Sequence, residues 1–215
     1  MIVQIIPAIL STKEEDFRKD VFRYKNAESF KSGWVHIDFM DNIFVPNKSI
    51  EPSVVAKYPI SLHKEAHPMV AHPLEWVDGL VKAGFERIIF HIEAKDDIKE
   101  CIEYIRSKGL EVGLAINSET PIENLQAFVD KIDIVLVMTI VPGFQGQSFI
   151  PKALDKVREI KQKSWSVKVG VDGSVKDTNV KEIVESGVDF IILGSYLLRG
   201  DIDENLEVLW EAING

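Results

Sequence analysis

Short apolar runs alternate with amphipathic stretches along the whole chain, and this alternation constrains the fold more than any other feature. The runs have the length of strands and are rich in β-branched and aromatic residues: 3–10, 34–40, 60–70, 88–92, 111–116, 134–141, 167–171 and 190–193. The stretches between them carry apolar residues at helical spacing: 73–82, 98–108, 122–129, 152–161 and 175–185. Continuous apolar strands separated by helices are typical of a parallel sheet that helices cover. The sequence therefore predicts an α/β protein.

A glycine stands at four of the junctions between a helical stretch and the following strand, at Gly33, Gly84, Gly109 and Gly187. Glycine supplies the left-handed residue that ends a helix there. One β/α unit is about 25 residues long, so about eight units nearly account for the 215 residues. Such units close into a barrel or form an open sheet, and the lack of a GxGxxG motif after the first strand favours the barrel. We expect a single (β/α)8 barrel domain over residues 1–215.

Composition limits the partners and the compartment. The formal net charge of -9 and the pI near 5.1 argue against a nucleic-acid partner, because no basic face would attract phosphate backbones. A single cysteine, Cys101, excludes an intramolecular disulfide and fits a reducing cytosol. The sequence shows no signal peptide and no run long enough to span a bilayer. We expect a cytoplasmic protein with neither a nucleic-acid nor a membrane partner.

Unusual polar residues fall where the expected strands end, which is where the active site of a β/α barrel lies. His36 and Asp38 alternate near the end of the second strand, so their side chains share one face. His67 lies near the end of the third strand and Asp172 follows the seventh. An imidazole or a carboxylate on an apolar strand is costly to bury without partners. These residues are therefore candidates for the functional site.

Two imidazoles and two carboxylates without a thiolate suit Zn²⁺, Mn²⁺ or Fe²⁺, which makes these four residues a candidate metal site. In the alternative interpretation, His36 and His67 are hydrogen-bonded core histidines and Asp172 only opens a turn. The residue types leave both open. His91 and Glu93, at the end of the fourth strand, either support the metal ligands by hydrogen bonding or belong to an ordinary packed strand.

Glycine-containing turns follow the last three expected strands. Their backbone N–H groups can hold an anion, and barrels often bind phosphate after the last two strands. Ordinary turn chemistry also needs glycine, but three such turns on neighbouring units favour phosphate. The candidate substrate- and phosphate-binding residues are Gly143, Phe144, Gln145, Gly146, Gly173, Ser174, Gly194 and Ser195.

The methionines after Met1 also gather near strand ends, at Met40, Met69 and Met138. Methionine usually fills a core, but three at one rim suggest an apolar wall around the site.

Taken in order, these segments resemble the ribulose-phosphate 3-epimerase family over essentially the full length. The two specific pieces are the His-x-Asp-x-Met-Asp motif that ends at Asp41 and the Pro-Gly-Phe-x-Gly-Gln motif that begins at Pro142. Further matching segments are 6–10, 44–47, 67–70, 91–94, 117, 120–121, 137–139, 171–173 and 194–195.

The resemblance implies a TIM barrel of the ribulose-phosphate-binding type that carries one divalent metal ion (Zn, Mn or Fe). The implied ligands are His36, Asp38, His67 and Asp172. It also implies an isomerase of the pentose phosphate pathway, in which Asp38 and Asp172 are the acid/base pair that interconverts D-ribulose 5-phosphate and D-xylulose 5-phosphate through an enediolate. Two carboxylates on opposite faces of C3 suit this reaction, because one removes a proton and the other returns one. We expect a small-molecule sugar phosphate as the partner and a homo-oligomer as the assembly.

Five positions depart from the family pattern. Ala8 replaces a usual Ser, Glu65 replaces Asp, and glycine is replaced at three positions, by Asn42, Gln145 and Ser174. These changes lie in the loops and at positions expected to contact the substrate, whereas the implied metal ligands and acid/base pair are unchanged. The sequence therefore indicates the type of reaction more strongly than the identity of the substrate.

Three alternatives stand beside the pentulose-phosphate epimerase. One is a hexulose-6-phosphate (allulose 6-phosphate) 3-epimerase, and a second is a barrel that binds a sugar phosphate without turnover. The third, a phosphate-binding decarboxylase, is disfavoured because the second strand carries His-x-Asp instead of the Asp-x-Lys-x-x-Asp arrangement of those enzymes.

Overall fold

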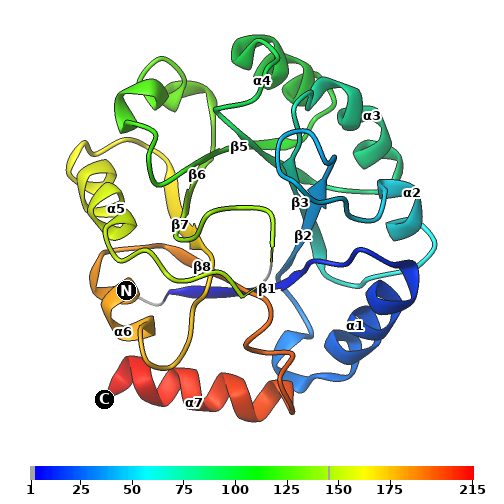
Figure 1. Cartoon of the computed structure of the whole chain (residues 1–215), viewed down its shortest axis with the longest axis vertical. Coiled ribbons are helices and arrows are strands. Elements are labelled where there is room, and N and C mark those ends of the chain that lie inside the picture. Colours follow the sequence, from blue (N-terminus) through cyan, green and yellow to red (C-terminus); the bar gives the residue numbers. More distant parts are fainter. Residues whose placement is uncertain (1–2, 145) are drawn as a thin grey trace.

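The computed structural model of the chain describes residues 3–144 and 146–215. Its strands form a closed parallel barrel in sequence order, in which β1 (Gln4–Ile9) pairs with both β2 (Trp34–Met40) and β8 (Phe190–Leu193). The remaining strands are β3 (His63–Met69), β4 (Arg87–His91), β5 (Glu111–Ile116), β6 (Ile134–Met138) and β7 (Lys168–Asp172). Figure 1 looks down this barrel, with the helices arranged in a ring outside it. The predicted (β/α)8 TIM barrel is confirmed.

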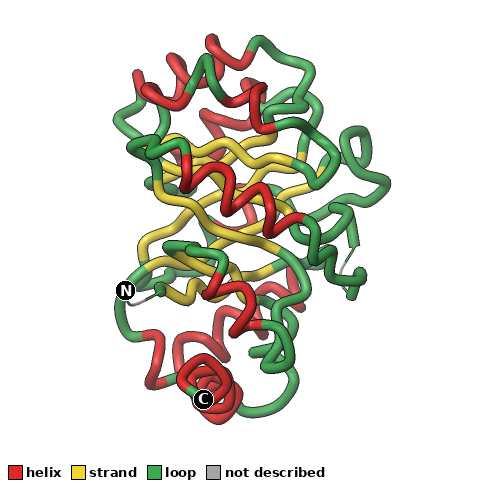
Figure 2. The backbone as a smooth tube through the Cα atoms, turned by 90° about the vertical axis from the view of Figure 1, so that its left-hand side faces the viewer, coloured by secondary structure: helices red, strands yellow, loops and turns green. Residues whose placement is uncertain are grey.

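Helices connect most of the strands: α1 (Glu14–Asn26), α2 (Pro52–Val55), α3 (Leu74–Lys82), α4 (Ile98–Ser107), α5 (Ala153–Gln162), α6 (Val180–Glu185) and α7 (Ile202–Asn214). A short 3-10 helix, η1 (Glu28–Phe30), follows α1. Figure 2 shows the barrel from the side, with the strands enclosed by the helices. Within the described residues, no helix is both long and apolar enough to cross a membrane.

Two connections differ from the predicted helices. In place of the helix predicted over 122–129, the chain forms two short 3-10 helices, η2 (Ile122–Leu125) and η3 (Val129–Lys131). Ile122 and Leu125 are both buried, and a 3-10 turn also brings residues three apart onto one side. The helix predicted over 175–185 begins only at Val180. Asn179 holds the preceding turn, since its Oδ1 accepts from the Lys176 N–H (2.8 Å) and its Nδ2 donates to the Ser174 carbonyl (3.0 Å).

The two main parts of the core arise because alternate strand residues face opposite sides of the barrel wall. Side chains such as Ile37 and Phe39 pack outward against the helices in one large cluster. A smaller cluster fills the barrel interior and includes Ile6, Leu136 and Phe190. Phe190 leaves no room for a neighbouring side chain, since a Cβ at Gly170 would lie 2.2 Å from its ring. The interior is therefore packed through most of its depth, and chemistry is confined to one end.

Candidate active site

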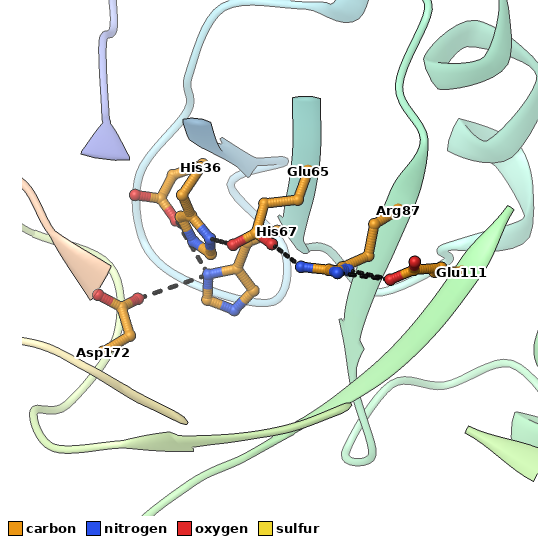
Figure 3. A network of polar contacts seen from close by, with 7 residues as sticks. His36, Glu65, His67, Arg87, Glu111 and Asp172 are labelled. Carbon is orange, nitrogen blue, oxygen red and sulfur yellow. Dashed lines mark hydrogen bonds and ion pairs between the residues drawn. The ribbon is translucent and has the colours of Figure 1, made fainter. Parts of the chain in front are cut away.

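Four potential metal ligands come from three strands. His36 and Asp38 lie on β2, and the β2–β3 register places His67 directly beside Asp38. Asp172 ends β7. One ligand atom from each of these residues can be chosen so that all four lie within 4.8 Å of one another. In Figure 3, His36, His67 and Asp172 point toward a common centre.

The carboxylate of Asp38 lies between the two histidines. Its Oδ1 is 3.2 Å from His36 Nε2 and 2.9 Å from His67 Nδ1. Asp172 Oδ2 lies 3.6 Å from the same His67 nitrogen. Both imidazoles are fully buried, whereas the two aspartates line the cleft above them. The carboxylates therefore face the open cleft, and the histidines lie beneath them.

A hydrogen-bonding partner occupies the far nitrogen of each histidine. His36 Nδ1 lies 2.7 Å from Glu65 Oε1, and His67 Nε2 lies 3.0 Å from His91 Nε2. His91 Nδ1 in turn lies 3.1 Å from Glu93 Oε2. Such partners fix the orientation of a ligand ring and leave its other nitrogen available for a metal. The structure thus places His91 and Glu93 behind His67, in agreement with the first of the two interpretations of these residues.

The two aspartates are in unequal electrostatic environments. Burial alone would raise the pKa of Asp38, but the charges and hydrogen bonds of His36 and His67 outweigh it and lower that pKa. Burial and the negative charge of Asp38 raise the pKa of Asp172 to about 6. Burial opposes the charged form of His36, yet Asp38 and Glu65 raise its pKa to about 10. Carboxyl groups whose pKa values are pushed apart are suited to separate acid and base roles.

The donor set fits a divalent transition metal. Two imidazole nitrogens and two carboxylate oxygens match the preferences of Zn²⁺, Mn²⁺ and Fe²⁺. A cation among them would also offset the repulsion between the two aspartates, which is one cause of the raised pKa of Asp172. The cluster can therefore hold a metal ion, and the donor atoms alone do not select one of the three.

The cleft over the aspartates spans about 690 Å³, including its open mouth. The candidate phosphate-binding residues in the described part of the chain all line it: Gly143, Phe144, Gly146, Gly173, Ser174, Gly194 and Ser195. Gln145, also a candidate, lies outside the described residues. Met69 and Met138 line the cleft, whereas Met40 is fully buried in a cluster with Val45 and Met69. The turns after β6, β7 and β8 thus meet at one end of the cleft, beside the aspartates.

The turn after β7 has an unusual backbone. Gly173 has a φ of 125°, and a Cβ there would lie 2.5 Å from Ile140. Ser174, which stands where the family usually has glycine, also has a positive φ of 51°. Its hydroxyl donates to the carbonyl of Gln147, which helps to hold the serine in this conformation. The hydroxyl of Thr139 lies 2.9 Å and 2.7 Å from the carbonyl oxygens of Asp172 and Gly173.

Several residues of the site received no role from the sequence. Asp41 binds the backbone of the β2 loop, accepting from the N–H groups of Ile43 and Phe44 (both 2.8 Å) and of Ala71 (2.6 Å). Its place in the His-x-Asp-x-Met-Asp motif was a signal that could have pointed to this role. Thr139 lies in another segment that matches the family, 137–139, whereas Tyr196, which lines the cleft, gave no comparable signal. Ala8 also lines the cleft, so the serine usual in the family would present its hydroxyl there.

Comparison with known proteins shows similarity over nearly the whole chain. Residues 4–198 match the family model described as the ribulose-phosphate 3 epimerase family. The ribulose-phosphate 3-epimerase of Chlamydia muridarum is 38% identical over 185 residues, covering 82% of this chain and 81% of that protein. The Escherichia coli K12 enzyme of the same name is 36% identical over 198 residues, covering 89% and 87%. The Schizosaccharomyces pombe one is 35% identical over 208 residues, covering 94% and 90%.

Solved structures with lower sequence identity share the fold. A mutant tryptophan synthase alpha-subunit from Pyrococcus furiosus has a TM-score of 0.71 at 17% identity, covering 97% of this chain and 98% of that one. The 3-hexulose-6-phosphate synthase of Salmonella typhimurium has a TM-score of 0.69 at 14% identity, covering 99% of both chains. At such identities the likeness supports the barrel architecture alone.

Proposed function

The chain belongs to the ribulose-phosphate 3-epimerase family, and from this premise we propose that it interconverts D-ribulose 5-phosphate and D-xylulose 5-phosphate with Asp38 and Asp172 as its acid/base pair. It is an isomerase of the epimerase type, as its relatives are named. The observation that carries the residue assignment is the approach of these two carboxylates to each other at the floor of the glycine-lined cleft.

The two aspartates suit a reaction that inverts one carbon. Epimerisation at C3 requires removal of a proton from one face of the carbon and delivery of a proton to the other. Asp38 and Asp172 can serve as these two groups, one accepting a proton as the base and the other donating one as the acid. In the reverse direction the roles exchange. Both groups reach the cleft from the carboxyl ends of β2 and β7, so substrate carbon can lie between them.

We propose His36, Asp38, His67 and Asp172 as the ligands of one divalent metal ion, either Zn²⁺, Mn²⁺ or Fe²⁺. When bound, such an ion supplies positive charge that stabilises the oxyanion developing on the substrate. Glu65 and His91 keep the two imidazoles turned toward the cluster through their hydrogen bonds. Buried as they are, the imidazoles need these partners whether or not an ion is bound.

The other end of the cleft is proposed to bind the phosphate. Backbone N–H groups in the turns that contain Gly146, Gly173 and Gly194 are suited to an anion, which is consistent with the acidic net charge of the chain. Met69 and Met138 line the cleft and would keep bulk water away from the reacting carbon. The names of the curated relatives favour a pentulose phosphate over the hexulose phosphate alternative. The homo-oligomer and the cytoplasmic location stay predictions.

Isotope exchange tests the proposal directly. The protein is incubated in D₂O with D-ribulose 5-phosphate and, separately, with D-allulose 6-phosphate, and deuterium at C3 is followed together with the epimeric product. We expect deuterium at C3 and formation of D-xylulose 5-phosphate with the first substrate, and much slower exchange with the second. Faster turnover of the hexulose phosphate would reassign the substrate, and no exchange with either would contradict the epimerase assignment.

A further inference from the structure

A row of polar side chains leads away from the site along the inner face of the barrel. Residues at matching positions on four neighbouring strands form it: His36 pairs in register with Glu65, Glu65 with Arg87, and Arg87 with Glu111. Figure 3 shows the row running from the cluster toward β5. Because the strands of a barrel are tilted, a row that begins near the middle of β2 reaches the first residues of β4 and β5.

Every contact along the row is short. Glu65 Oε1 accepts from His36 Nδ1 at 2.7 Å, and Glu65 Oε2 accepts from Arg87 Nη1 at 2.6 Å. Arg87 Nε and Nη2 both donate to Glu111 Oε2, at 2.8 Å and 2.5 Å. The guanidinium also lies over the ring of Trp34, 3.7 Å from its centroid. Arg87 is thus held on its face and on two of its edges, in a single orientation.

Burial makes this arrangement costly. Glu65 is completely buried and Arg87 is 5% exposed. A buried ion pair often adds little net stability compared with apolar residues of similar volume, so stability is a weak explanation for it. What the pair does supply is orientation, because both oxygens of Glu65 are engaged and its carboxylate cannot turn without losing a bond. A fixed carboxylate fixes the imidazole that donates to it.

We propose that Arg87 is a positioning residue for the metal centre, acting through Glu65 on His36. Arg87 holds one oxygen of Glu65, so that the other accepts the His36 Nδ1–H and His36 Nε2 faces Asp38. The inference rests on the metal-binding role proposed above for His36. It also gives a reason for Glu65, which stands where the family usually has the shorter aspartate: the longer side chain spans the distance between His36 and Arg87.

The test measures metal affinity. Protein stripped of metal is titrated with Co²⁺ or Zn²⁺ in competition with a chromophoric chelator, for wild type, Arg87→Met, Glu65→Gln and the double variant. We expect each single variant to weaken binding by about 10- to 100-fold, the range for such supporting residues. The double variant should lose no more metal affinity than the more strongly affected single variant, because Arg87 acts through Glu65. Arg87→Lys should recover part of the affinity, since an ammonium can reach one acceptor but lacks the planar fork.

A second readout does not depend on bound metal. The Nδ1–H proton of His36 gives a downfield NMR resonance that a hydrogen bond to a fixed carboxylate protects from exchange, and it is recorded with and without Zn²⁺. In Arg87→Met and Arg87→Lys we expect this proton to exchange faster than in wild type. If wild-type protein binds none of the ions, the proposed metal centre fails, whereas the resonance still decides whether Arg87 orients His36.

A matched control separates positioning from stability. Lys161 forms an ion pair of 2.8 Å with Asp189 that is less buried than the Arg87–Glu65 pair, and within the described residues none of its contacts reaches the site. Lys161→Met should lower the melting temperature without changing metal affinity or the His36 resonance. The inference is overturned if Arg87→Met behaves like this control. Should Arg87→Met fail to fold, Arg87→Lys carries the same comparison, and unchanged affinity and exchange in that variant overturn the inference equally.

Discussion

At the scale of single residues, Asp38 and Asp172 carry the same side chain but have different neighbours. Asp38 lies between two imidazoles, which stabilise its charge, whereas burial and a negative neighbour raise the pKa of Asp172 to about 6. The difference arises from position alone, because both are aspartates near the carboxyl end of a strand. We therefore expect the proposed proton transfer to be sensitive to either carboxyl group, and each can be tested separately.

Replacing Asp38 or Asp172 by Asn preserves the size of the side chain and removes its ability to accept a proton. We expect kcat for epimerisation to fall by about 10²- to 10⁴-fold or more in each variant, the usual contribution of a general acid or base. The coupled assay for the epimeric product measures this loss, and circular dichroism checks that the barrel remains folded. Asp155→Asn, on α5 away from the cleft, should leave kcat unchanged. Turnover at the wild-type rate in either site variant contradicts the acid/base assignment.

At the scale of elements, the loops after β2 and β7 are shaped by different means. The Asp41 carboxylate accepts hydrogen bonds from three backbone N–H groups and so connects the β2 loop to the residues that follow β3. The loop after β7 instead depends on left-handed backbone at Gly173 and Ser174. Both loops lie next to residues of the proposed acid/base pair, so we expect their conformations to influence the cleft directly.

The Asp41 carboxylate should contribute stability that depends on pH. Partial burial would raise the pKa of Asp41, but its bonds to backbone N–H groups outweigh burial and hold that pKa below the ordinary value of 3.8. A carboxyl group with a lowered pKa in the folded state stabilises the protein above its unfolded pKa and loses this effect as pH falls through the folded value. We expect Asp41→Ala to lower the free energy of unfolding by about 1–2 kcal/mol at pH 7, from lost charge-assisted hydrogen bonds to a partly exposed group.

Urea denaturation of wild type and Asp41→Ala between pH 3 and pH 7 measures this contribution. The difference in free energy of unfolding between the two proteins should stay constant down to about pH 4. Below that pH it should shrink, because the wild-type carboxylate becomes protonated. A difference that is the same at pH 3 and pH 7 would show that the charge of Asp41 does not hold the loop.

A methyl group at Gly173 should disturb the β7 loop in two ways. Its φ of 125° is unfavourable for an L-residue, and the new Cβ would lie 2.5 Å from Ile140. We expect Gly173→Ala to lower the free energy of unfolding by about 2–4 kcal/mol and to raise KM for the sugar phosphate. Gly109→Ala is the matched control, because Gly109 has a φ of 79° with nothing within 4 Å of the added Cβ. Gly109→Ala should lower the free energy of unfolding by only about 1–2 kcal/mol. An equal loss in both variants would show that the contact with Ile140 does not cause the destabilisation in Gly173→Ala.

At the scale of the whole molecule, the proposed metal centre joins β2, β3 and β7, strands from opposite sides of the barrel. An ion that binds only the folded protein stabilises it by mass action, by about 2.7 kcal/mol at a concentration of 100 times Kd. Its removal also leaves the charges of Asp38 and Asp172 to repel each other. Stability and activity should therefore respond together to chelation.

Strong chelation should abolish epimerisation and lower the melting temperature by about 5–10 °C, given the usual shift per kcal/mol for a chain of this size. Addition of Zn²⁺, Mn²⁺ or Fe²⁺ after removal of the chelator should restore both, as followed by the coupled assay and by thermal denaturation. His67→Gln is the control, since a variant that lacks a ligand should show little further shift with chelator. Full activity in protein shown by elemental analysis to contain no metal contradicts this prediction.

Much of the element order can be read from the chain because hydrophobic periodicity is a local property. The strands at 34–40, 111–116 and 190–193 match their predicted bounds. The prediction was wrong over 122–129, where the spacing of Ile122 and Leu125 suits a 3-10 turn as well as a helix. It was also wrong over 175–179, where the side-chain bonds of Asn179 replace the first helical turns. Both errors arise where a few local contacts outweigh the periodic pattern.

For the candidate site, the residue types and their places at strand ends were visible beforehand, including His36, Asp38, His67 and Asp172, because strand alternation assigns each side chain to a face. Which residues of separate strands lie level with one another was not visible, since the tilt and register of the closed barrel set that. The row from His36 to Arg87 shows the difference. Arg87 is the first residue of its strand and is far from His36 in sequence, yet only Glu65 separates it from this proposed metal ligand in the hydrogen-bonded row. Hydrophobic periodicity along the chain specifies the strands and helices and their order. Closure of the barrel then determines which residues of separate strands come into contact.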